Sequence, residues 1–143
     1  MTATVLVPID IAQPEAGEKA LELARGIANP QTSKFILMSV IEPVPTYVAT
    51  QLPEGIHEKA LSDAAATLGD IAARQGLPDT TETVVREGQP SNEILEAAKE
   101  TGTDLIVIAS HDPGVAQFFL GSVAARVVRH AHCSVLVARN LDG

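Results

Sequence analysis

IASHDPGVAQFFLGS, residues 108–122, joins an apolar run to an amphipathic segment. The run LIVIAS that leads into it is typical of a buried strand, and the pattern that follows Gly121 is typical of a helix. A helix N-terminus presents unpaired backbone N–H groups and a partial positive charge, so Gly121 and Ser122 would suit a phosphate. Glycine and serine are also ordinary residues at the start of a helix, so the choice between these interpretations depends on the rest of the chain.

Five short apolar runs occur along the chain, and amphipathic segments separate them. The runs predict strands at residues 4–9, 34–41, 81–87, 104–110 and 133–139. The amphipathic segments predict helices at residues 16–27, 56–75, 90–101 and 121–130, and residues 43–55, which hold three prolines, are predicted as a loop. The side chains expected to face the core are Ala16, Ala20, Leu23, Ala24 and Ile27 in the first helix, Ile56, Ala60, Ala64, Leu68, Ile71 and Gln75 in the second, and Val123, Ala124, Val127 and Val128 in the last.

This alternation predicts a single α/β domain over residues 1–143. Strands joined by crossover helices run parallel, and the crossovers are right-handed. We therefore expect a doubly wound, five-stranded parallel sheet in the order 3-2-1-4-5, with helices on both faces, as in Rossmann-like folds. Ligands of such sheets bind beyond the carboxyl ends of the strands, where the winding direction reverses. That point lies between the first and fourth strands, whose ends carry Pro8, Ile9 and Asp10, and Ala109, Ser110 and His111.

The chain carries a formal net charge of -8, from 18 Asp and Glu against 10 Lys and Arg. Such a surface repels phosphate backbones at long range, which argues against a nucleic-acid partner. The single cysteine, Cys133, cannot form an internal disulfide, which fits a reducing compartment. MTATVLVPID at the N-terminus lacks the basic region of a signal peptide, and no apolar run approaches the length of a membrane span. We expect a soluble cytoplasmic protein with no membrane partner.

The common nucleotide and hydrolase motifs are missing from the sequence. The absence of GxxxxGK[ST] argues against a P-loop NTPase, and the absence of GxGxxG after the first strand argues against a dinucleotide-dependent oxidoreductase. Ser110 lacks the surrounding GxSxG of a hydrolase nucleophile. His130, His132 and Cys133 are potential zinc ligands, but a structural site usually needs four and the sequence has no second cluster, so no metal site is expected.

Several segments together resemble the universal stress protein family. They are VPID at the end of the first strand, EGQP after the third, IASH, LGSVAARVVRHA and CSVLVAR. The resemblance covers nearly the whole chain, and ASHDP is similar to the F/G-type branch. It implies the fold predicted above, in its adenine nucleotide alpha hydrolase-like form, with ATP or ADP in the cleft between the first and fourth strands. It also implies a homodimer.

The residues of the nucleotide site are those that match the family pattern. ATP-binding members carry G-x-x-G, nine residues and G-[ST], of which Gly121 and Ser122 match the final pair. Ala109 and Asp112 stand in place of the first two glycines, and only eight residues separate Asp112 from Gly121. The resemblance places first-strand contacts at Pro8, Ile9 and Asp10, an adenine-side backbone contact near Val40, and further contacts at Ser110, His111, Gly114 and Val123. Mg²⁺ would be held mainly by the phosphates and water.

Two of these residues, Asp10 and His111, also have simpler interpretations. Asp10 could accept hydrogen bonds from the adenosine end of a nucleotide, or favour the dipole of the first helix. His111 could donate to a phosphate, or be an exposed loop histidine. Gly114 would allow the loop to fold back with positive φ.

The sequence thus indicates a nucleotide-sensing stress-response regulator with an unidentified protein partner. Turnover of ATP would at most be slow, because no general base or arginine finger is arranged for it. A dimeric interaction module without nucleotide binding is an alternative, which Ala109 and Asp112 favour. An ATP-dependent ligase or hydrolase is a third, but it would need a glycine- and serine-rich loop where residues 10–17 read DIAQPEAG.

The predicted homodimer is built on the fifth strand. Val135, Leu136 and Val137 follow one another, so both faces of that strand are apolar. The expected strand order places it at the sheet edge, where unpaired N–H and C=O groups can pair with a second chain. Antiparallel pairing of two copies would give a closed two-fold dimer.

Overall fold

A five-stranded, all-parallel sheet in the order β3-β2-β1-β4-β5 forms the centre of the molecule. The structure is a computed structural model that describes residues 3–110 and 120–139. The strands are β1 (Thr4–Pro8), β2 (Lys34–Ile41), β3 (Glu82–Glu87), β4 (Leu105–Ala109) and β5 (Ser134–Ala138). The helices are α1 (Pro14–Ile27), α2 (Thr46–Ala49), α3 (Ile56–Arg74), α4 (Pro90–Thr101) and α5 (Ser122–His130). The predicted fold class and strand order are confirmed.

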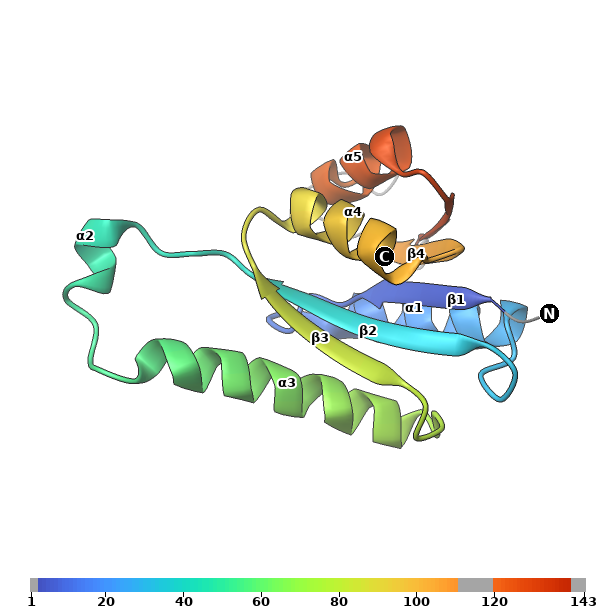
Figure 1. Cartoon of the computed structure of the whole chain (residues 1–143), viewed down its shortest axis with the longest axis horizontal. Helices are drawn as coiled ribbons and strands as arrows, with labels where there is room; N and C mark the ends of the chain where they lie inside the picture. Colours follow the sequence, from blue (N-terminus) through green and yellow to red (C-terminus); the bar gives the residue numbers. More distant parts are fainter. Residues whose placement is uncertain (1–2, 111–119, 140–143) are drawn as a thin grey trace.

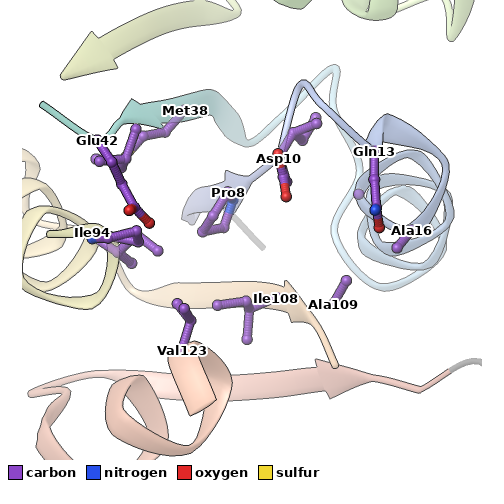
Figure 2. Close-up of a pocket in the computed structure, with 14 residues that line it drawn as sticks. Pro8, Asp10, Gln13, Ala16, Met38, Glu42, Ile94, Ile108, Ala109 and Val123 are labelled. Atoms are coloured by element: carbon purple, nitrogen blue, oxygen red, sulfur yellow. The ribbon is translucent and has the colours of Figure 1, made fainter. Parts of the chain in front are cut away.

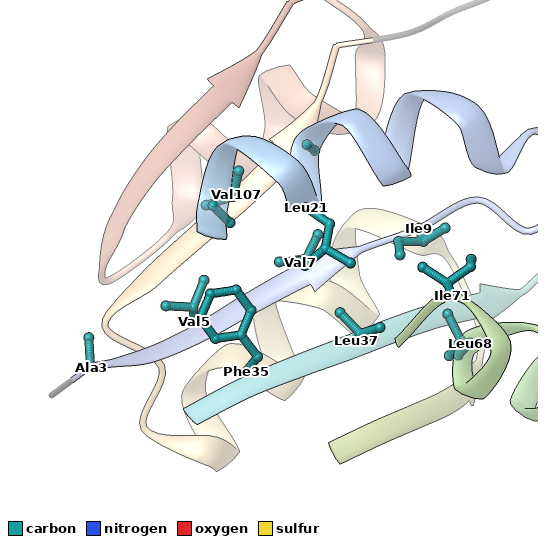
Figure 3. Close-up of a cluster of buried hydrophobic side chains, with 12 residues drawn as sticks. Ala3, Val5, Val7, Ile9, Leu21, Phe35, Leu37, Leu68, Ile71 and Val107 are labelled. Atoms are coloured by element: carbon teal, nitrogen blue, oxygen red, sulfur yellow. The ribbon is translucent and has the colours of Figure 1, made fainter. Parts of the chain in front are cut away.

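Side chains alternate between the two faces of the sheet along each strand. Because the strands are apolar, both faces are apolar, and helices cover both of them. Val5 and Val7 of β1 point to one face and Leu6 to the other, and all three are fully buried. The first face packs against α1 and α3, around Leu21 and Leu68, and Figure 3 shows this cluster. The second face packs against α4 and α5, whose core side chains include Ile94, Ala97, Ala124 and Val127. The doubly wound sheet predicted from the sequence is therefore the observed one (Figure 1).

The buried stripe of α1 differs from the predicted one. Leu23 and Ile27 were expected to face the core, but they are 43% and 55% exposed. Gly17 and Leu21 are buried instead, together with Ala20 and Ala24. Three of the four buried residues are glycine or alanine, so the helix can lie close to the sheet. The sequence pattern instead predicted that the larger Leu23 and Ile27 would face the core.

Two other helices also bury fewer residues than predicted. In α3, Ile56 is 41% exposed and Ala60 is exposed, while Ala64, Leu68 and Ile71 are buried as expected. Figure 1 shows the first turns of α3 extending past the ends of the strands, where no sheet covers them. In α5, Val128 is 47% exposed, because only the side of the helix that carries Ala124 and Val127 packs on the sheet.

The segment predicted as a loop contains one short helix that the sequence pattern did not indicate. The helix α2 has four residues and no buried side chain, so it had no apolar periodicity to reveal it. It lies well away from the sheet (Figure 1). None of the helices in the two described stretches is long and apolar enough to cross a membrane.

Candidate functional site

A pocket of about 230 Å³ lies at the carboxyl ends of β1 and β4, where the two strands stop being paired. β1 pairs with β4 at Val5–Leu105 and Leu6–Ile106. Beyond these pairs the two strands are not paired with each other, so they can separate. From there β1 leads into α1, and β4 leads into the segment that precedes α5. The pocket therefore occupies the point of reversal expected for a ligand in a doubly wound sheet.

Six of the residues predicted from the sequence line this pocket. They come from β1 and the two residues after it, from β2, from β4 and from α5, and they are Pro8, Ile9, Asp10, Val40, Ala109 and Val123. Figure 2 shows four of them, Pro8, Asp10, Ala109 and Val123, around a common space. The fold thus brings together residues that are more than 100 positions apart in the sequence.

Three other predicted site residues in the described stretches, Ser110, Gly121 and Ser122, are not among those that line the pocket. Ser110 directly follows the lining residue Ala109, and Gly121 lies two residues before the lining residue Val123. The Gly121 N–H donates to Ser110 Oγ at 3.4 Å. Gly121 has an ordinary φ of -61°, so its backbone does not require glycine, and Ser122 is the first residue of α5. His111, Asp112 and Gly114 lie outside the described residues.

Asp10 both shapes the start of α1 and faces the pocket. Its Oδ1 accepts the Ala12 N–H at 3.0 Å, and its carbonyl oxygen accepts the Gln13 N–H at 3.0 Å. These bonds form the turn between β1 and α1. In the described part of the chain Oδ2 makes no hydrogen bond, and Figure 2 shows the carboxylate directed into the pocket.

The backbone of Val40 also faces the pocket. The Met38 carbonyl accepts the Ile9 N–H at 2.7 Å, toward β1, whereas the Ile41 carbonyl accepts the Gly88 N–H at 3.0 Å, on the side of β3. Backbone groups of a strand point alternately to its two neighbours, so those of Val40 point to the same side as those of Met38. The last β1 residue paired with β2 is Pro8, opposite Met38, so the Val40 N–H and C=O lie beyond the end of β1.

Aliphatic side chains form the walls of the pocket. Met38, Ile94 and Ile108 are buried at 0%, 3% and 5% exposure and line it together with Val123. Ile94 was missed by the sequence analysis, because its contribution depends on how α4 packs over β2 rather than on any motif. A slot with aliphatic walls suits a flat, apolar face such as that of a heterocyclic base.

Glu42 is another lining residue that the sequence analysis did not predict. It follows the end of β2, and its exposed side chain lines the pocket. The carboxylate makes no hydrogen bond or ion pair with any residue that the structure describes, and Figure 2 shows it directed toward Ile94. With Asp10 it gives the pocket two carboxylates, and none of the described lining residues is a lysine or arginine.

Gly17 allows α1 to approach the pocket closely. A Cβ at this position would lie 2.8 Å from Cγ2 and 2.9 Å from Cγ1 of Ile9. These separations are shorter than van der Waals contact between carbon atoms, which is about 3.5–4.0 Å. The absence of a side chain therefore determines where Ile9, and with it the floor of the pocket, can lie.

Cys133 is a partly buried thiol immediately before β5. Desolvation raises its pKa, and the negative charge of Asp104 raises the pKa further. Within the described ranges no group of three or more His, Cys, Asp or Glu side chains is arranged to hold a metal ion.

The fold and the pocket define a parallel α/β protein with a crevice at its point of strand reversal. The sequence profile of the universal stress protein family matches residues 1–139, and the chain belongs to that family. The resemblance inferred from the sequence is thereby confirmed.

Individual relatives are similar over almost the full chain. A universal stress protein of Thermus aquaticus is 29% identical over 140 residues, which cover 97% of this chain and all of that protein. The structure of a universal stress protein in complex with cAMP superposes with a TM-score of 0.68 at 24% identity, covering 96% of this chain and 97% of that one. An Arabidopsis thaliana family member with AMP bound gives a TM-score of 0.65 at 21% identity, covering 98% and 93%. These structural similarities concern the fold.

Proposed function

We propose that this protein binds an adenine nucleotide, ATP or ADP, in the pocket between β1 and β4, and acts as a nucleotide-sensing regulator of a stress response. The observation that carries the proposal is the Val40 backbone, which offers one donor and one acceptor to the pocket beside aliphatic walls. Adenine presents the matching pair, a ring nitrogen that accepts and an exocyclic amine that donates. The adenine nucleotides named in the two related structures, cAMP and AMP, are consistent with it.

The other groups take roles around the bound base. The free oxygen of Asp10 accepts from the ribose hydroxyls, and the start of α5 at Gly121 and Ser122 takes the phosphates. Mg²⁺ accompanies the phosphates and is coordinated by them and by water. The protein acts by binding rather than by catalysis, in the cytoplasm, and as a homodimer.

The dimer forms through β5. This strand pairs with β4 on one side and lies at the edge of the sheet, and Val135, Leu136 and Val137 are partly exposed there. Pairing with a second copy satisfies the edge N–H and C=O groups of both chains.

Mass spectrometry of the small molecules released when the purified protein is denatured tests the proposal. ATP or ADP at about one per chain is the expected result. If the protein is empty, titration calorimetry with ATP and Mg²⁺ decides, and a protein that is empty and also fails to bind added ATP contradicts nucleotide binding.

The second candidate function is a dimeric interaction module that binds no nucleotide. It is favoured by the two carboxylates of the pocket, which repel phosphates, and by the hydrogen bond that already engages the Gly121 N–H. The same calorimetry distinguishes the two candidates.

A further inference from the structure

We infer that Glu42 determines which base the pocket accepts, by receiving a hydrogen bond from the exocyclic amine of a 6-aminopurine and rejecting purines with an oxygen at that position. The inference rests on the proposed nucleotide binding and extends it. It assigns a specificity to a side chain that no sequence motif indicated.

The direction of β2 decides where the amine lies. In every residue the N–H precedes the C=O along the chain, so the Val40 carbonyl is the one of its two groups nearer to residue 42. A purine that accepts from the Val40 N–H and donates to the Val40 C=O must therefore place its amine toward the end of β2. Glu42 follows at that end, two residues beyond Val40.

The side chain of Glu42 lies on the same side of β2 as the pocket. Side chains two residues apart share a face, and Met38, Val40 and Glu42 all line the pocket. Figure 2 shows the Glu42 carboxylate reaching into the space between Ile94 and Pro8. An amine bound to the Val40 carbonyl keeps a second hydrogen, and Glu42 is the described lining residue that supplies a carboxylate just beyond the end of β2.

The chemistry of a carboxylate explains why Glu42 would favour a purine with an amine at position 6 over one with an oxygen there. An ionised carboxylate only accepts hydrogen bonds, and a hydrogen bond to a charged acceptor is about twice as strong as one between neutral groups. A 6-oxo purine presents an acceptor in the same place, so two oxygens face each other without a proton between them. Because no residue in the described ranges pairs with the Glu42 side chain, it is available to the ligand in this structure.

The experiment compares three ligands, ATP, ITP and purine riboside triphosphate, which carry an amine, an oxygen and a hydrogen at position 6. Calorimetry with Mg²⁺ measures each Kd for the wild type, Glu42→Ala, Glu42→Gln and the control Glu54→Gln. Glu54 is an exposed acid outside the pocket, so its substitution changes the net charge by the same amount as Glu42→Gln does. The readout is the ratio of affinities, which cancels the general effect of charge on the phosphates.

We expect Glu42→Ala to reduce the preference for ATP over purine riboside triphosphate by about tenfold, the effect of one charge-assisted hydrogen bond. Glu42→Gln should reduce the preference for ATP over ITP by a similar factor, because an amide can donate to the oxygen. Glu54→Gln should leave both ratios as in the wild type. Equal changes in all three affinities at Glu42 overturn this inference and leave nucleotide binding intact, whereas a wild type that binds none of the three ligands overturns both.

Discussion

Replacing Gly17 by alanine adds one methyl group between α1 and the end of β1. The new Cβ would lie 2.8, 2.9 and 3.0 Å from three atoms of Ile9, closer than carbon atoms approach without repulsion. Ile9 is 3% exposed and Gly17 is buried, so neither has open space into which to move. The substitution must therefore shift the Ile9 side chain or lift the helix.

Two opposing effects set the size of the change. Adding a methylene-sized group to a packed core costs about 1–3 kcal/mol. Replacing glycine by alanine inside a helix contributes about 0.5–1 kcal/mol of stability. A matched control isolates the first effect: Gly69 lies within α3, and a Cβ there would meet no atom within 4 Å. Gly69→Ala should therefore stabilise the protein by the helix effect alone.

Urea unfolding followed by circular dichroism measures both variants. We expect Gly17→Ala to be less stable than Gly69→Ala by about 1–3 kcal/mol, since the helix effect is common to both. Because Ile9 lines the pocket, Gly17→Ala should also weaken ATP binding, which Gly69→Ala should leave unchanged. Equal stability of the two variants would refute the reasoning, because it would show that α1 accommodates a methyl group without cost.

Three further predictions concern the phosphate end of the site, the dimer and the thiol. Gly121→Val should abolish ATP binding measured by calorimetry, because a branched side chain at the start of α5 blocks the phosphates; equal binding by the variant and the wild type places the phosphates elsewhere. Val137→Asp should convert a dimer into a monomer in light scattering, because it brings two carboxylates into one interface; a wild type that is already monomeric at micromolar concentration contradicts the dimer. Asp104→Asn should speed alkylation of Cys133 at pH 8. The desolvation that raises the thiol pKa remains, but the Asp104 charge that also raises it is removed, so more thiolate forms. An unchanged alkylation rate contradicts this prediction.

The fold could be predicted because its signals are local. Each strand is a short apolar run and each crossover helix an amphipathic segment, and the chirality of the connections leaves few ways to assemble them. The bounds of β2 were predicted to the residue, and α4 begins at Pro90 and stops at Gly102, whose φ of +66° favours glycine. The order of the strands and of the helices that connect them was predicted correctly, but the burial of some side chains was not. Leu23, Ile27 and Val128 are more exposed than their hydrophobicity suggested.

The candidate site could be predicted only where topology fixes it. The ends of β1 and β4 must lie together in a sheet of this order, and Asp10 and Ala109, which follow or end these strands, both line the pocket. Ile94 and Glu42 reach the pocket through the packing of α4 and the path of the chain after β2. Neither is determined by the spacing of residues along the sequence, and no motif marks them.

The distribution of charge separates the two ends of the proposed ligand. In the proposed complex the base would meet the backbone groups of Val40, the aliphatic walls and the carboxylate of Glu42, and all of these contacts with the neutral ring are short-range. The phosphates approach a chain of net charge -8 whose described pocket residues include two carboxylates and no lysine or arginine. If the nucleotide binds as proposed, we therefore expect most of the binding energy to come from the base, with Mg²⁺ offsetting repulsion at the phosphates. Consequently, affinity for adenosine should vary little with salt and magnesium, whereas affinity for ATP should fall steeply when magnesium is removed.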